Sequence, residues 1–483
     1  MNYFAKSGQA LFGLVVKDIP MGAWESVEMK ITDTKDGTVY MDTSSFDLST
    51  MPLTHDQLPD YSHLGNVSAI YNCGPGMMND KTKTTIEDSF MTVISGTTAE
   101  KLASYVATLE GKGYEFIGKN VVDGDTYYTY RKFGSLLYLY HNKCLGETRI
   151  ICDNSSDLLS EINYEYEKKA GDTVEFYQYS LNYAFADRQG YDPVVYTESG
   201  NINCGMCYIF KLPDNKVIIV DSGHETQSTA ASRAGLVNFL KKITGTKDGE
   251  KVEIAMWFFT HAHGDHVRMA ADIVAEYHDQ ISIESVTHNF PSYQVLSGGY
   301  DANTFTLKDN LNKYFPGVTY HKLHTGEVLS LAGLTMEVVF THEDLVNASG
   351  KSRVSDFNST STVLKINFEG KTIMLLGDLA DDAEGVFIAL HNPEYFKSDV
   401  VQIAHHGFNY LASLYPLIDA PIAIFPQSMF NMKDPGNSQG NLNKYKGFMK
   451  YSTEEYFAHK YTYKFTVANG EIEAEALPRY DAK

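Results

Sequence analysis

The chain has 483 residues, of which 43% are hydrophobic and 21% are charged, a balance that excludes a disordered, collagen-like or low-complexity protein. The 40 Lys and Arg residues stand against 61 Asp and Glu residues, so the formal net charge at pH 7 is −21. A surface this negative repels phosphate backbones, which disfavours nucleic acid as a partner.

The first 20 residues, MNYFAKSGQALFGLVVKDIP, contain a short apolar stretch that Gly13 interrupts and that no small-residue cleavage site follows. We therefore expect no secretory signal, although a chain that began after a removed signal would look the same. No apolar run reaches the length of about 20 residues that a membrane-spanning helix needs. The expected location is the cytoplasm by default, and secretion stays open as the alternative.

A polar and charged segment at about residues 155–170 separates two regions with different patterns. Before it, alternation and β-branched or aromatic residues predict strands at 10–17, 26–32, 125–132, 135–142 and 147–153. Helical spacing of apolar residues predicts a helix over 98–112. We therefore expect a smaller N-terminal α+β domain at 1–160, whose role the sequence does not indicate, and a second domain at 170–483.

The second region begins with predicted strands at 174–181, 206–212 and 216–221, and a predicted helix at 229–243. Two small residues, Cys204 and Cys207, form a single C-G-M-C in this region, and a zinc ribbon would need a second such pair. A redox pair is the alternative to two residues of a loop, and we favour the loop. Strand-like and helical stretches then alternate to the end of the chain, which predicts a layered α/β domain.

A dense group of polar side chains follows the apolar strand predicted at 254–259. The segment reads Thr260-His261-Ala262-His263-Gly264-Asp265-His266, and a helical pattern comes directly after it. Three imidazoles and a carboxylate within six residues form a ligand set suited to zinc or a similar divalent ion. Taken singly, Asp265 would be an ordinary helix N-cap and each His an ordinary loop residue. The joint pattern is expected by chance on the order of 0.002 times in such a chain, so we favour a metal site.

Three further segments offer partners for this group. The apolar stretch 371–378 ends in Gly-Asp378, although Asp378 could simply cap the helix predicted at 381–391. Another apolar stretch, 399–404, runs into His405-His406-Gly407, where the alternative is a pair of surface histidines. Earlier, Val220-Asp221-Ser222-Gly223 predicts a tight turn in which Asp221 braces the loop.

In this order, the motifs T-H-A-H-G-D-H, L-L-G-D and A-H-H-G, preceded by V-D-S-G, resemble those of the metallo-β-lactamase superfamily. The H-H-G ending and the stretch from Glu198 to Gly223 are similar to the branch that contains the hydrolase domain of the competence protein ComEC/Rec2 and bacterial phosphorylcholine esterase. The resemblance covers about residues 172–430 and leaves the first 155 residues uncovered. It implies a four-layer αββα sandwich with metals at one edge of its two sheets.

The resemblance also implies roles for individual residues. His261 and His263 would hold one zinc ion, Asp265, His266 and His405 would hold the second, and Asp378 would bridge both. His406 would be a catalytic proton donor or phosphate contact, although the choice of ligand between His405 and His406 stays open. A further His ligand of many relatives has no convincing counterpart, because the candidates His288, His321, His324 and His342 do not lie in a matching motif.

The implied function is hydrolysis by a hydroxide that two Zn²⁺ ions bind and Asp378 orients, with Mn²⁺ or iron as alternative metals. We expect a small-molecule substrate, with a small phosphodiester or phosphocholine-type ester ranked first and a lactone, thioester or β-lactam as the alternative. Phe408, Tyr410 and Tyr415 could form an aromatic wall for it, or pack the following helix. An iron oxidoreductase is disfavoured because His263 stands where iron-using relatives usually carry Glu. A non-catalytic binding protein is the remaining alternative, and the oligomeric state is not indicated.

Overall fold

The computed structural model describes residues 2–7, 10–15, 26–32, 39–47, 53, 57–73, 89–154, 156–181, 205–224, 227–291, 302–346, 357–427, 456 and 461–477, and the structural statements below concern these residues. Strands β1 (Asn2–Ser7) and β2 (Ala10–Val15) form one hairpin, and β3 (Ser26–Thr32) and β4 (Val39–Asp47) form another. Among the described helices, none combines the length and the apolar composition that crossing a bilayer requires.

The first large sheet contains the strand that precedes the histidine cluster. Its order is β17 (Thr319–Lys322), β16 (Ser285–His288), β14 (Val252–Phe259), β13 (Val217–Val220), β12 (Tyr208–Lys211), β11 (Glu175–Gln178), β24 (Thr462–Ala468) and β25 (Glu471–Leu477), with β15 (Ile281–Ile283) also paired to β14. Strands β13, β14, β16 and β17 are parallel, so their carboxyl ends share one edge.

The second large sheet carries the Gly-Asp and His-His motifs. Its order is β18 (Val328–Leu331), β19 (Leu334–Phe340), β20 (Val363–Phe368), β21 (Lys371–Leu375), β22 (Val400–Gln402) and β23 (Ile422–Ile424). The last three of these strands are parallel. The carboxyl ends of β21 and β22 therefore lie at a common edge of this sheet.

The two sheets pack face to face, because alternate side chains of their strands fill one core. Met256 and Phe258 of β14 belong to this core together with Ile366 of β20 and Ile373 of β21. The other face of β14 carries Trp257 and Phe259, which alternate with Met256 and Phe258 along the strand. These two side chains pack against helices in a second core. A strand buried on both faces explains the continuous apolar run in the sequence.

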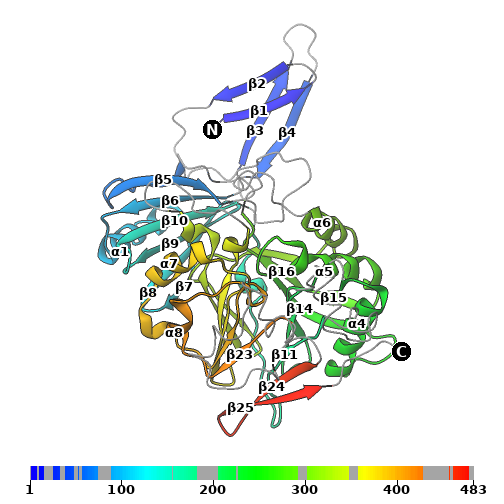
Figure 1. Cartoon of the computed structure of the whole chain (residues 1–483). Helices are drawn as coiled ribbons and strands as arrows, with labels where there is room; N and C mark the ends of the chain where they lie inside the picture. Colours follow the sequence, from blue (N-terminus) through cyan, green and yellow to red (C-terminus); the bar gives the residue numbers. More distant parts are fainter. Residues whose placement is uncertain are drawn as a thin grey trace.

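Helices cover the outer faces of both sheets (Figure 1). Helices α4 (Ala230–Thr244), α5 (Gly264–Tyr277) and α6 (Ala302–Tyr314) lie on the first sheet, and α7 (Asp381–Leu390) and α8 (Leu414–Ile418) lie on the second. The order of layers is therefore helix, sheet, sheet, helix, and the αββα sandwich expected from the sequence is confirmed.

A third sheet, from the N-terminal part of the chain, packs beside α7. Its order is β5 (Asn66–Asn72), β6 (Ser89–Ser95), β10 (Glu147–Asp153), β9 (Ser135–Asn142), β8 (Asp125–Lys132) and β7 (Glu115–Val122). One face is covered by α1 (Ala99–Val106), the first part of the helix predicted at 98–112. The other face shares a core with the sandwich, in which Tyr138 and Ile151 join Phe340 and Phe387. The division into domains at 1–160 and 170–483 stays a prediction.

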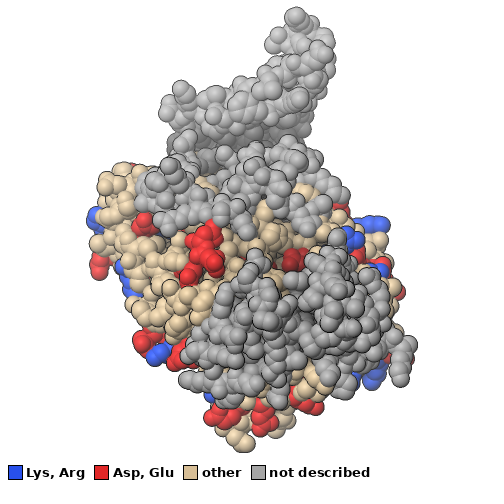
Figure 2. Space-filling model, in the orientation of Figure 1, with Lys and Arg blue, Asp and Glu red and all other residues tan. Residues whose placement is uncertain are grey.

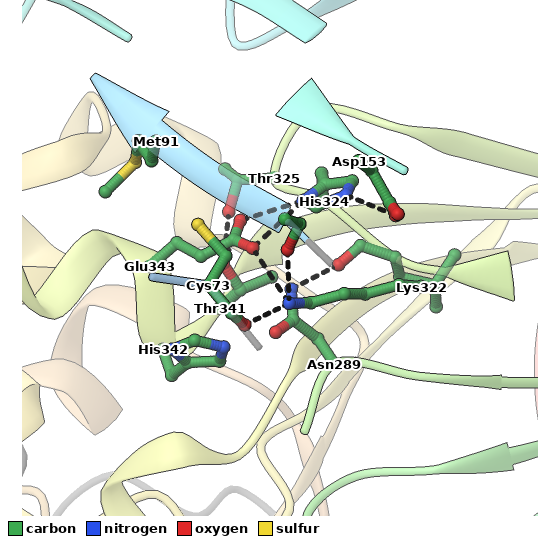
Figure 3. Close-up of polar contacts among 12 residues, drawn as sticks. Cys73, Met91, Asp153, Asn289, Lys322, His324, Thr325, Thr341, His342 and Glu343 are labelled. Atoms are coloured by element: carbon green, nitrogen blue, oxygen red, sulfur yellow. Dashed lines mark hydrogen bonds and ion pairs between the residues drawn. The ribbon is translucent and has the colours of Figure 1, made fainter. Parts of the chain in front are cut away.

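Buried charges reinforce this shared core (Figure 3). The ring of His324 lies between Asp153 of β10, at 3.3 Å from Nε2 to Oδ2, and Glu343 of the sandwich, at 3.0 Å from Nδ1 to Oε1. Lys322 Nζ lies 3.7 Å from Glu343 Oε1 and donates to the carbonyl of Cys73, directly after β5. These four charged side chains are fully buried, and each has a partner of opposite sign. Desolvation alone would make such charges costly, so their pairing ties the N-terminal sheet to the sandwich.

Candidate metal centre

The first motif lies on the turn that joins β14 to α5. The strand ends at Phe259, and His263 occupies the position before the first residue of the helix. His261 and His263 therefore lie on the turn itself, whereas Asp265 and His266 belong to the first helical turn. His261 and His266 are fully buried, and His263 and Asp265 are partly exposed.

The second sheet brings Asp378 and the His405-His406 pair to the same place. Asp378 follows β21, and the histidines follow β22, its parallel neighbour. The main-chain nitrogen of Thr362, at the start of β20, donates to the carbonyl of Thr260 at 2.9 Å, which joins the edges of the two sheets. Three segments far apart in the sequence therefore meet at one edge of the sandwich.

Ligand atoms of four residues gather at this edge. The potential ligand atoms of Asp265, His266, Asp378 and His406 all lie within 4.8 Å of one another. Asp378 Oδ2 is 3.1 Å from His266 Nε2 and 3.2 Å from His406 Nε2. His406 Nε2 is also 3.2 Å from Asp265 Oδ2. Two imidazole nitrogens and two carboxylates form a set that a divalent cation of the zinc type accepts.

A second group of nitrogens adjoins the first through the same carboxylate. His261 Nε2 lies 3.1 Å from His263 Nδ1 and 3.9 Å from Asp378 Oδ2. Burial, together with the neighbouring His266 and His263, lowers the pKa of His261 well below its ordinary value. His261 is therefore neutral near pH 7 and keeps a lone pair for a cation. Asp378 lies between the two groups, as a bridging ligand would.

The charge balance of the centre favours a cation. Asp378 is fully buried, and among the described residues its Oδ1 has no hydrogen-bond partner. Burial would raise the pKa of Asp378, but His406 and His266 hold it well below its ordinary value. In turn, Asp378 and Asp265 overcome the effect of burial on His406 and raise its pKa to about 9. The buried carboxylate of Asp378 and the partly exposed one of Asp265 thus attract positive charge, and the residues present fit a divalent metal.

Asp221, at the end of β13, orients one of the ligand histidines. Its Oδ2 lies 2.8 Å from His266 Nδ1, and its two oxygens accept from the main chain and the hydroxyl of Thr260, each at 2.9 Å. Asp221 has a φ of 56°, in the left-handed region, and this backbone turn points the carboxylate back under the cluster. With Nδ1 engaged, Nε2 of His266 is the nitrogen that faces Asp378.

The geometry favours a different assignment for the His405-His406 pair from the one expected from the sequence. His406, and not His405, belongs to the group of ligand atoms. His405, His406 and Gly407 have φ values of 49°, 53° and 80°, so three successive left-handed residues turn the second imidazole, rather than the first, toward Asp378. His405 instead lies against Phe408, with the ring centroids 5.6 Å apart.

The other singled-out residues lie outside the ligand group. His324 bridges Asp153 and Glu343, and His321 Nε2 lies 3.0 Å from Glu327 Oε1. Tyr415 is buried, and its hydroxyl accepts from Ala404 N at 3.0 Å, so it packs the turn and cannot form a wall for a substrate. Cys204 lies outside the described residues, and Cys207 is a buried free cysteine.

Comparison with known proteins gives matches among solved structures alone. No family model and no curated protein matches the chain. Among solved structures, the metallo-β-lactamase fold protein YhfI from Bacillus subtilis is 13% identical, over 48% of this chain and 70% of its own, with a TM-score of 0.23. Human tRNase Z, short form, is 12% identical, over 41% of this chain and 70% of its own, with a TM-score of 0.22. Scores this low support no conclusion, so the fold assignment rests on the sheets and cores described above.

Proposed function

We propose that this chain is a metal-dependent hydrolase of the metallo-β-lactamase superfamily. The observation that supports this most directly is the position of Asp378 Oδ2, within 3.2 Å of nitrogens from both His266 and His406. A buried carboxylate between two imidazoles from separate segments has no evident structural purpose, because apolar packing would stabilise this edge at lower cost. The αββα layers and the order of the motifs favour the same function.

In this proposal, two groups of ligands share one carboxylate. His261 and His263 would hold the first cation, Asp265, His266 and His406 would hold the second, and Asp378 would be a ligand that both groups share. Bound zinc, the expected metal, would supply Lewis acidity and a water molecule of lowered pKa. The chain's own contribution is orientation. Asp221 fixes the ring of His266, and the hydroxyl of Ser361 accepts from the main-chain nitrogen of Asp378 at 3.0 Å.

The proposed substrate is a small phosphodiester or a phosphocholine-type ester. The net charge of −21 disfavours long polyanions, which the surface would repel. On the face shown in Figure 2, the described Lys and Arg residues lie near the rim, while Asp and Glu residues also occur near the middle. For a short ester with one phosphate, the bound cations alone would compensate the negative charge.

A turnover screen of the zinc- and manganese-loaded protein tests this proposal. It compares bis-p-nitrophenyl phosphate, p-nitrophenyl phosphorylcholine, a lactone and nitrocefin. We expect the two phosphodiesters to be hydrolysed, and His63→Gln, an exposed histidine of the N-terminal part, to leave the rates unchanged. Cleavage of only the lactone or nitrocefin would exclude the proposed substrate class. A protein that binds no metal and turns over none of the four would exclude the hydrolase.

A further inference from the structure

Gln402, the last residue of β22, has a fully buried side chain whose hydrogen bonds to the described residues all involve main-chain groups. Its Oε1 accepts from Leu376 N at 2.8 Å, and its Nε2 donates to the carbonyls of Gly377 at 2.9 Å and Ile403 at 2.7 Å. All three bonds are possible in one amide orientation only, because a flipped amide would set its oxygen against two carbonyl oxygens.

These bonds lie where the ladder between the two strands has ended. The register of β21 and β22 pairs Ile373 with Val400 and Met374 with Val401. Leu376 and Gly377 lie beyond that pairing, on the turn that leads to Asp378. The side chain of Gln402 therefore continues the connection between the strands by hydrogen bonds that the backbone of β22 no longer makes.

The carbonyl of Gly377 is the point at which both ligand-bearing turns meet. It accepts from Gln402 Nε2 and also from the main-chain nitrogen of His405, at 3.1 Å. Gly377 itself has a φ of 58°, and a Cβ there would lie 3.0 Å from the Oγ of Ser361. Ser361 thus fixes the turn on one side and Gln402 fixes it on the other. Gly377 directly precedes Asp378, and His405 directly precedes His406.

We propose that Gln402 is a positioning residue of the metal centre: it holds the turn of Asp378 in register with the turn of His406. The importance of Gln402 for metal binding rests on the proposed function, whereas the alignment of the two turns is a property of the metal-free chain. A residue that only fills the core would be replaced without effect by a side chain of equal volume. A positioning residue is sensitive to the loss of its hydrogen bonds at constant shape.

Two variants separate these roles, and a third is the control. Gln402→Glu keeps the shape and the acceptor but loses both donors, and Gln402→Met keeps the approximate volume and loses all three bonds. Asn163→Leu is the matched control, since Asn163 is a side-chain amide that accepts from Ser330 N at 2.8 Å, on the edge strand β18 of the same sheet.

The first readout is hydrogen–deuterium exchange of the metal-free full chain. We expect peptides over 371–380 and 400–408 to lose protection in both Gln402 variants and to keep it in Asn163→Leu. The second readout is titration with Co²⁺, followed by the visible absorption of the bound ion. We expect the two Gln402 variants to show an altered spectrum and a roughly 10–100-fold lower affinity, the range typical of residues that orient ligands.

Wild-type exchange in both peptides together with a wild-type cobalt spectrum would overturn the inference, even if the variants were less stable. If the wild-type chain binds no Co²⁺ while the variants still lose protection, the proposed function fails and the positioning role stands. If the variants bind Co²⁺ as the wild type does and exchange does not change, the metal centre stands and Gln402 is only a core residue.

Discussion

Asp221 Oδ2 and His266 Nδ1 lie 2.8 Å apart at the base of the candidate metal centre, and the other nitrogen of the same ring lies 3.1 Å from Asp378 Oδ2. Because the two ring nitrogens have different partners, the carboxylate of Asp221 sets which of them faces the cation site. Asp221 is itself held by two bonds from Thr260, the residue before His261. Asp221 thus links the end of β13 to the first motif, and His266 continues this connection to Asp378 of the second sheet.

Replacing Asp221 tests this link. We expect Asp221→Ala to lower zinc affinity roughly 10–100-fold, because the ring of His266 would lose the partner that orients it. A competition titration with a chromogenic chelator measures the effect. Asp214→Asn is the control, since Asp214 lies in the hairpin turn between β12 and β13, where it accepts from Tyr164 and Lys216 N. Equal zinc affinity in Asp221→Ala and the wild type would show that His266 needs no such support.

Asp378→Asn removes one charge at constant shape from the point that both ligand groups share. We expect turnover to fall to background and the zinc content to fall, since an amide oxygen is a poorer ligand for zinc and cannot balance the charge of two cations. His263→Ala should also abolish turnover, because it removes a ligand of the group formed by His261 and His263. Activity assays and metal analysis of the purified variants provide the measurement. Full turnover in either variant would contradict the proposed ligand set.

The layers of the fold could be predicted from the sequence because they depend on local patterns. The apolar run before Thr260 predicts a strand buried on both faces, which is β14. The alternation of strands and helices after residue 174 predicts layered α/β packing, and the layers form as expected. Three imidazoles and a carboxylate within one turn indicate a metal without any knowledge of long-range contacts.

The choice between His405 and His406 could not be made from the sequence, because it depends on backbone dihedral angles. Adjacent histidines look equivalent in sequence, and non-glycine residues with positive φ are uncommon. Gln402 was missed for a related reason. A glutamine inside an apolar strand shows only as a break in the pattern. Two of its three partners, Leu376 and Gly377, directly follow a neighbouring strand whose register the sequence does not display.

The buried pair of Lys322 and Glu343 should matter greatly to stability. Lys322→Met leaves the carboxylate of Glu343 with less compensating charge in a dry site, and we expect a loss of roughly 3–5 kcal/mol in the free energy of unfolding. Glu343→Gln should cost a similar amount, and the double variant should cost less than the sum. Urea unfolding of the four proteins gives the coupling energy. Strict additivity would show that the two charges act independently.

The same network gives stability a predictable dependence on pH. Burial would lower the pKa of His324, but Glu343 and Asp153 raise it to about 10. The contribution of His324 to the free energy of unfolding is therefore complete below about pH 6.5 and is lost as the pH rises toward 10. Burial would raise the pKa of Glu343, but His324 and Lys322 lower it to about 2. The contribution of Glu343 to the free energy of unfolding is therefore lost as the pH falls from about 4.5 toward 2.

We therefore expect this network to contribute most between about pH 4.5 and 6.5. Unfolding free energies measured from pH 4 to 10 should fall on the alkaline side, and His324→Gln should flatten that fall because it removes the group that titrates. The exposed histidine variant His63→Gln should keep the wild-type profile. If the unfolding free energy falls equally at alkaline pH in His324→Gln and in the wild type, groups other than His324 cause the pH dependence.

The contact between Gly326 and Tyr127 predicts that the N-terminal sheet and the sandwich unfold together. Gly326 has a φ of 92°, and a Cβ there would lie 1.8 Å from Cδ1 of Tyr127 in β8, so Gly326→Ala forces the two parts to separate locally. The neighbouring control Gly333→Ala shares the left-handed strain, with a φ of 89°, but its Cβ would meet only Lys168, at 3.2 Å from Cε.

Trp257 fluorescence reports the sandwich once Trp24, the other tryptophan of the chain, is replaced by Phe, and hydrogen exchange of β9 and β10 reports the N-terminal sheet. Because the two parts share a core that contains Tyr138 and Phe340, we expect both probes to show one transition, which Gly326→Ala shifts to lower urea concentration by more than Gly333→Ala does. A variant in which the sheet loses protection while Trp257 keeps its wild-type midpoint would show two separate folding units.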